Sequence, residues 1–184
     1  DTLGVNDTAT VTIAYEMSDD EGLPSTSTVT ITVNAGNTAP TAVPDTVSGT
    51  ENEVLVVLPL INDTDPDIGD GPATFSLDDV SIASVTGLSE TSGGSVSLFA
   101  TNSFRFFPGS DFNELDAGDT ATVIVDYEMS DDDGATSTSS VNITVNGEND
   151  APVAFVDNGA GTETETLSFD VLANDTDVDL DDGP

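Results

Sequence analysis

A block of sequence occurs twice in this chain, and the interval between the two copies sets the size of the folding unit. Residues 7–34 recur as residues 119–146, and the two copies are identical at 20 of 28 aligned positions. A second pair of segments has the same spacing: NDTDPD begins at Asn62 and NDTDVD at Asn174. We call this spacing, from residue 7 to residue 119 and from residue 62 to residue 174, the common interval. One interval shared by two different segments indicates a tandem array whose repeat is a whole domain.

The common interval divides the chain into three parts. We expect residues 1–36 to be the last two strands of one repeat, residues 37–148 to be a complete repeat, and residues 149–184 to be the first two strands of the next. A unit as long as 37–148 can bury an adequate core without disulfides, and the chain has no cysteine. We interpret the sequence as a window from a longer protein.

Alternation of apolar and polar residues runs through segments rich in Val, Ile and Thr, and helical periodicity is nearly absent. Val123, Val125 and Tyr127 face one side of such a segment, while Ile124 and Asp126 face the other. One face is then core and the other solvent, as in antiparallel sheets packed in a sandwich. The complete repeat is predicted to have strands at residues 42–48, 53–60, 80–86, 95–99, 103–107, 120–129 and 136–146, with one helical turn within 111–118.

The predicted fold class is all-β: tandem Ig-like, seven-stranded antiparallel β-sandwiches. Aromatic side chains are expected to close the core of the complete repeat. These are Phe104, Phe106 and Phe107, joined by Phe75 and Phe99.

The charge of the chain restricts its partners. It has 36 acidic residues against the single cation Arg105, for a net charge of −35. Nucleic acid is excluded, because phosphate binding needs cationic side chains. Membrane insertion is also excluded, because the longest apolar run, 54–61, falls well short of a span.

Such a charge would repel itself, and either high salt or bound divalent cations could relieve the repulsion. A halophilic surface would spread its acids over every exposed face. Here the acids collect in short clusters between the predicted strands. We therefore favour bound cations, although a single Asp-rich turn would be only an ordinary solvated turn.

An up-and-down course through a sandwich brings these clusters to its two ends. The loops after the second and sixth strands lie beside the preceding linker, and the loops after the first strand and before the sixth lie beside the following one. The first end is expected to gather Asn37, Asp63, Asp65, Asp67, Asp131, Asp132 and Asp133. The second end is expected to gather Glu51, Glu53, Asp116, Asn149 and Asp150, and the common interval makes Asp175, Asp177 and Asp179 the next repeat's counterparts of Asp63, Asp65 and Asp67.

Carboxylates brought together in this way repel one another by about 4 kcal/mol per pair at about 4 Å and intermediate dielectric. Calcium would relieve this repulsion, since it takes 6 to 8 oxygen ligands in flexible geometry. Softer metals have no His or Cys ligand in this chain. The sequence therefore predicts Ca²⁺ as the cofactor, bound where consecutive repeats meet.

The run LDAGDTATVIVDYEMSDDDGATSTSSVNITVNGENDAP, from Leu115 to Pro152, resembles the C-terminal half of bacterial cadherin-like repeats of the VCBS type, and NDTDPD and NDTDVD resemble their NDTDxD motif. The resemblance covers nearly the whole chain and implies a cadherin-like sandwich with calcium at the junctions. Its ligand sets would be Asn37, Asp63, Asp65 and Asp132 at the first junction, and Glu51, Asp116, Asn149, Asp150, Asp175 and Asp177 at the second. Thr38 and Gly4 depart from the pattern, since each stands where an acid is expected.

The resemblance implies a secreted, cell-surface protein. The chain would be a non-catalytic extender of a large bacterial adhesin, stiffened by calcium, that projects a distal binding domain for cell adhesion or biofilm. Its partners would be neighbouring repeats of the same polypeptide and, in a fibre, other copies of the chain. The alternative is a repeating subunit of an extracellular filament or surface layer.

Two further classes find less support in the residues. An enzyme without His, Cys or Lys would depend on a carboxyl pair with one shielded member, and these acids lie in open polar loops. A carbohydrate-binding module would need an exposed aromatic platform, but Tyr15 and Tyr127 fall on the core-facing alternation and the chain has no Trp.

Overall fold

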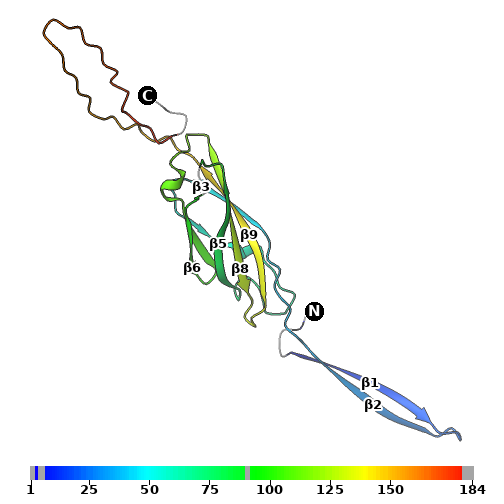
Figure 1. The fold of residues 1–184 in the computed structure, drawn as a ribbon. Coiled ribbons are helices and arrows are strands. Elements are labelled where there is room, and N and C mark those ends of the chain that lie inside the picture. The colour runs from blue at the N-terminus through cyan, green and yellow to red at the C-terminus, as the bar shows by residue number, and fades with distance from the viewer. Residues whose placement is uncertain (1–2, 4–6, 90–91, 180–184) are drawn as a thin grey trace.

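The structure is a computed structural model and describes residue 3 and residues 7–89 and 92–179. Figure 1 shows an elongated molecule with a hairpin at one end, a β-sandwich in the middle and an extended segment at the other end. The strands are β1 (Thr8–Ser18), β2 (Pro24–Asn34), β3 (Asp45–Thr50), β4 (Leu55–Val57), β5 (Ser76–Thr86), β6 (Ser95–Ala100), β7 (Ser103–Phe107), β8 (Thr120–Ser130) and β9 (Thr136–Asn146). Two 3-10 helices, η1 (Pro59–Asn62) and η2 (Gly109–Phe112), complete the assignment.

Seven strands form the sandwich. One sheet has the order β3-β9-β8-β5 and the other the order β4-β7-β6. The all-β sandwich expected from the alternation is therefore confirmed. Its pairings are antiparallel except for one, because β3 pairs parallel with β9, from Asp45 opposite Val141 to Thr50 opposite Asn146.

β6 and β8 each end one residue beyond their prediction, and three other strands differ more. β3 begins at Asp45 because Pro44 has no N–H to give to a ladder. β4 is cut to three residues because Pro59 starts η1 directly afterwards. β5 is longer than expected because it continues past a register shift between Leu77 and Asp79, where a bulge breaks the alternation.

The core lies between the two sheets. Phe104, Phe106 and Phe112 are completely buried, and the rings of Phe106 and Phe112 meet edge to face at 5.9 Å. Phe75 is buried as expected. The expectation for Phe99 was wrong: it is half exposed, because it lies on the outward side of β6 with Ser97, which pairs with Arg105.

The hairpin β1–β2 has the same register as β8–β9 at the common interval. Thr8 pairs with Asn34 as Thr120 pairs with Asn146, and the match continues along both strands. Its apolar side chains have no cover: Met17 is 61% exposed, whereas its counterpart Met129 is 0% exposed. The same sequence therefore forms the same hairpin whether or not its apolar face is covered.

The extended segment after β9 has little regular structure. Over residues 149–179 it contains no strand, and its one pairing is the isolated bridge between Val153 and Thr176. The two strands expected there are not formed. In the complete repeat β3 pairs with β9 and β4 with β7, and the described residues after β9 contain no counterpart of either partner. None of the helices in the described residues is both long and apolar enough to cross a membrane.

The repeated hairpin provides a matched pair of substitutions. Met129→Ala should lower the free energy of unfolding by about 2–5 kcal/mol, because it opens a cavity in the packed core. Met17→Ala, at the equivalent exposed position, should change it by less than about 0.5 kcal/mol. Urea unfolding followed by far-ultraviolet circular dichroism measures both. Equal losses would mean that the β1–β2 face is covered in solution.

Candidate metal centre

The first group of acidic residues lies where the linker at Asn37 and Thr38 meets two loops of the sandwich. The Asn37 amide donates to both carboxylate oxygens of Asp131, at 3.2 and 3.1 Å. The Thr38 backbone N–H donates to Asp67 Oδ2 at 2.8 Å. The linker, the loop after η1 and the β8–β9 loop thus meet at one end of the sandwich.

Each loop is shaped by one of its own carboxylates. Asp65 Oδ1 accepts from the backbone N–H of Asp67 at 2.7 Å. Asp131 Oδ1 accepts from Asp133 N–H at 3.0 Å and from Ala135 N–H at 2.9 Å. Asp favours turns because its short side chain can bond to the backbone just ahead of it.

Two sets of carboxylate oxygens lie within 4.8 Å of one another at this end. One set is Asp65, Asp67 and Asp70, and the other is Asp70, Asp132 and Asp133. Asp70 belongs to both and was missed in the sequence, although its recurrence as Asp182 at the common interval was a usable signal. Hydrogen bonding with the Asp132 carboxyl, burial and nearby negative charges raise the pKa of Asp70 to about 6.

The second group of acids lies at the opposite end, around Glu51. Glu51 is 2% exposed, and its Oε1 accepts from the Glu148 backbone N–H at 3.1 Å. Asp179 is 3% exposed, and its Oδ2 accepts from the Asp150 backbone N–H at 2.9 Å. Burial, and then the negative charges of Asp150, Asp179 and Glu148, raise the pKa of Glu51.

Several of these buried carboxylates keep one oxygen without a hydrogen-bond partner. Asp65 Oδ2, Glu51 Oε2 and Asp179 Oδ1 are all buried in this state. An unpaired buried carboxylate is costly, because it has lost its hydration and gained no compensating charge. These three oxygens are suitable ligands for a hard cation such as calcium.

The hydrogen bonds of the two linkers recur at the common interval. Thr38 N–H bonds to Asp67 as Asp150 N–H bonds to Asp179, and the bridge at Thr41 recurs at Val153. The segment 149–179 therefore repeats the linker contacts of residues 37–67, although it has no counterpart of β3 or β4.

Asp63 has a different environment from the other residues expected at the first end. Its Oδ1 accepts from the Val43 backbone N–H at 2.7 Å, and the Tyr127 hydroxyl lies 3.3 Å from its Oδ2. Burial raises the pKa of Asp63, and these two hydrogen bonds lower it. Asp175 repeats the contact by accepting from Phe155 N–H at 2.8 Å. This position of the NDTD motif therefore ties the segment after the linker to the sandwich.

The remaining expected residues lie around the second end without forming one set. Glu53 and Asn149 are exposed, and the Asn149 amide bonds to the neighbouring Asp150 carbonyl. Asp177 accepts from Asp179 N–H at 3.1 Å. Asp116 lies near the linker. Its backbone carbonyl oxygen is so close to Gly147 that a Cβ on that residue would collide with it.

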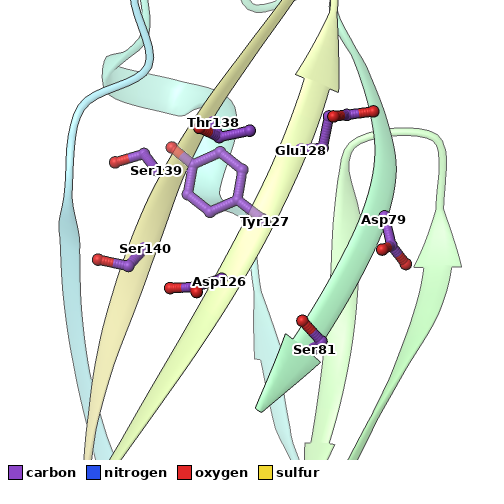
Figure 2. Close-up of a pocket in the computed structure, with 8 residues that line it drawn as sticks. All are labelled: Asp79, Ser81, Asp126, Tyr127, Glu128, Thr138, Ser139 and Ser140. Atoms are coloured by element: carbon purple, nitrogen blue, oxygen red, sulfur yellow. The ribbon is translucent and has the colours of Figure 1, made fainter. Parts of the chain in front are cut away.

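A further group of acids lines a hollow of about 520 Å³ on the outer face of β5, β8 and β9 (Figure 2). Asp79, Asp126 and Glu128 are exposed there among serine and threonine hydroxyls. In the part of the chain that the structure describes, these acids do not form a chelating set like those around Asp70. The hollow is an open polar sheet surface.

Comparison with known families assigns the sandwich. A family model described as a bacterial cadherin-like domain matches residues 37–147. The chain belongs to the bacterial cadherin-like domain family. The matched residues contain β3 to β9 and every member of the first acidic group. No curated protein matched the chain, and the narrower VCBS type stays a prediction.

The two roles of the NDTD motif can be separated by substitution. Asp63→Ala leaves Val43 N–H without its acceptor and takes from the Tyr127 hydroxyl one of its two acceptors, the other being the Val43 carbonyl. It should cost about 2 kcal/mol or more of stability. The loss should be equal in calcium and in chelator. Asp65→Asn keeps the acceptor for Asp67 N–H but removes the charge, so it should destabilise only in calcium. Thermal unfolding in both buffers measures this, and a calcium-dependent loss for Asp63→Ala would make Asp63 a ligand.

Asp45 predicts a pH dependence in calcium-free buffer. The pKa of Asp45 is raised from 3.8 to about 6 by burial and then by the Asp63 charge, while a hydrogen bond from Asn62 acts in the opposite direction. The folded state therefore binds more protons than the unfolded state in this range, and stability falls as pH rises from about 4 to about 6. Asp45→Asn should unfold at a higher temperature than wild type above pH 6, and the two should converge near pH 4.

The control for this experiment is Asp79→Asn, which removes one exposed negative charge from β5. Its difference from wild type should show no step between pH 4 and pH 6. Parallel pH curves for wild type and Asp45→Asn would contradict the assignment.

Proposed function

We propose that this chain is a non-catalytic extender of a large secreted bacterial adhesin or surface fibre, stiffened by calcium at its inter-repeat linkers. Membership of the bacterial cadherin-like family supports an extracellular repeat. In this proposal the repeats hold a distal binding domain away from the cell, for adhesion or biofilm formation. The proposal gives the chain no nucleic-acid partner and no membrane insertion.

The observation that carries the proposal is the pair of buried carboxylates at the second linker. Glu51 and Asp179 each bond one oxygen to the backbone and leave the other without a partner. Water is excluded from both side chains, so hydration cannot stabilise the two charges. A bound cation would satisfy the two free oxygens and cancel the repulsion between them.

Calcium suits these residues better than other common metals. The oxygens on offer are carboxylates, amide carbonyls and backbone carbonyls, which calcium accepts in numbers of 6 to 8. Asn37, Asp65, Asp67, Asp70, Asp131, Asp132 and Asp133 would hold calcium at the first linker. Glu51, Asp150, Asp177 and Asp179 would hold it at the second, where the ion supplies positive charge and no catalytic chemistry.

The partners in this proposal are neighbouring repeats of the same polypeptide. Residues 1–36 would be the end of a preceding repeat, residues 37–148 a complete one, and residues 149–184 the start of the following one. The shared register of β1–β2 and β8–β9 supports this division. So do the linker hydrogen bonds that recur at the same interval.

Stiffness would then depend on calcium. With calcium bound, each linker is tied to loops on both sides of it. Without calcium, a net charge of −35 favours separation of the repeats. Catalysis finds no comparable support, since the chain has no His, Cys or Lys.

Calcium should raise the unfolding temperature of the chain and reduce its flexibility. Each bound ion adds about 2.7 kcal/mol to the folded state when calcium exceeds the dissociation constant about 100-fold. Differential scanning calorimetry and small-angle X-ray scattering, with calcium and with chelator, measure the two effects. Isothermal titration calorimetry counts the ions.

A matched pair of variants assigns the effect to the linker. Glu51→Gln should remove much of the calcium-dependent increase in unfolding temperature, because it replaces a buried charged oxygen by an amide. Glu128→Gln, which removes an exposed charge on β8, should keep the increase. Superimposable melting and scattering curves with calcium and chelator would defeat the proposal.

A further inference from the structure

The outer face of the three-stranded sheet carries apolar side chains where solvent-facing polar ones are expected. Along β4, Leu55 and Val57 are buried, while Val54, Val56 and Leu58 are close to half exposed. Val56 lies opposite Arg105 on β7, and Arg105 lies opposite Ser97 on β6. The Arg105 guanidinium carbon lies 3.6 Å from the ring centroid of Phe99, which is half exposed. We call Val54, Val56, Leu58, Ser97, Phe99 and Arg105 the β4–β7–β6 face.

The charge of this sheet is opposite to that of the rest of the molecule. Strands β4, β6 and β7 contain no Asp or Glu and hold the chain's single cation. Residues 54–62 and 91–110 are two long runs without an acid. The other sheet of the sandwich has five acidic residues in its strands, Asp45, Asp78, Asp79, Asp126 and Glu128. The β4–β7–β6 face is therefore a part of the surface where another acidic molecule meets little like-charge repulsion.

The apolar face is not repeated in the sequence at the common interval. At the common interval, Val54, Val56 and Leu58 correspond to Thr166, Ser168 and Asp170. The inward positions stay apolar, because Leu55 and Val57 correspond to Leu167 and Phe169. Core positions are thus kept while the outward ones change from apolar to polar. The apolar strip is therefore present at residues 54–58 and is not repeated at residues 166–170.

We propose that the β4–β7–β6 face is a contact between two copies of the chain packed side by side. A second copy carries the same net charge of −35, so it can approach closely only where the surface lacks acids. This face meets that condition on both copies when they are related by a two-fold axis, which pairs identical patches. β4 is also an edge strand with β7 as its one neighbour, so the apolar strip is open at its side. The contact would join fibres laterally, and it does not depend on the proposed calcium sites.

Salt should strengthen this contact rather than weaken it. The apolar area gains from water exclusion at any ionic strength, whereas the repulsion between the two acidic chains is screened over about 8 Å at physiological salt. Sedimentation velocity of the full 184-residue chain in calcium should therefore show a dimer whose population rises with protein and with sodium chloride concentration.

The next repeat supplies the variant that tests the contact. Val54→Thr, Val56→Ser and Leu58→Asp together convert the strip to the residues of the following repeat, and should weaken dimerisation by more than about tenfold. Arg105→Glu adds a negative charge to the face and should also weaken dimerisation. It provides the test if the triple variant does not fold. Circular dichroism checks that both variants keep the fold.

The uncovered hairpin is the competing explanation for any association. Ile13→Thr with Ile31→Thr makes the exposed apolar face of β1–β2 more polar, and this variant should dimerise like the wild type. A chain that stays monomeric at every salt and protein concentration overturns the proposal. The proposal is also overturned if dimerisation is lost in the hairpin variant but kept in the triple variant and in Arg105→Glu.

Discussion

Like-charged carboxylates packed around a linker are the constraint on which the ends of this structure depend. At both ends a backbone N–H of the linker bonds to the aspartate that follows the NDTD motif, Asp67 at the first end and Asp179 at the second. At the first end, carboxylate oxygens from the loop after η1 and from the β8–β9 loop lie within 4.8 Å of one another. The backbone thus holds in place a set of charges that would otherwise separate, and the set becomes favourable when a cation joins it.

Asp63 attaches the NDTD segment to the sandwich. Its carboxylate bonds to the backbone just before β3 and to Tyr127 in the middle of β8. The NDTD segment therefore has two functions within a few residues: Asp63 fixes the segment to the core, and Asp65 and Asp67 belong to the acidic group at the linker.

Much of the fold could be predicted from the sequence, because alternation and the common interval both act over long segments. The β8–β9 hairpin follows from its clean alternation of core and solvent positions. The details that failed depend on single residues. Pro44 and Pro59 shorten two strands by removing N–H donors. Phe99 lies on the outward side of β6 with Ser97, which its apolar character alone does not reveal.

The acidic site, like the fold, could be predicted only in part. Turn chemistry predicted that the acidic segments are loops, and the sandwich topology predicted which of these loops lie at each end. Residue type alone could not separate Asp63 from Asp65, because the difference is the position of the Tyr127 hydroxyl. Asp70 was missed because it stands just beyond the DxDxD pattern, and its contact with Asp132 comes from a loop far away in the sequence.

The parallel pairing of β3 with β9 determines how the sandwich carries tension. A pull on the two ends of the repeat draws the start of β3 toward one linker and the end of β9 toward the other. Because the strands run in the same direction, the pull slides them past each other along their length. All the residue pairs between Asp45 and Thr50 on one side and Val141 and Asn146 on the other are then loaded together. Shear of this kind resists rupture better than a geometry that opens one hydrogen bond at a time.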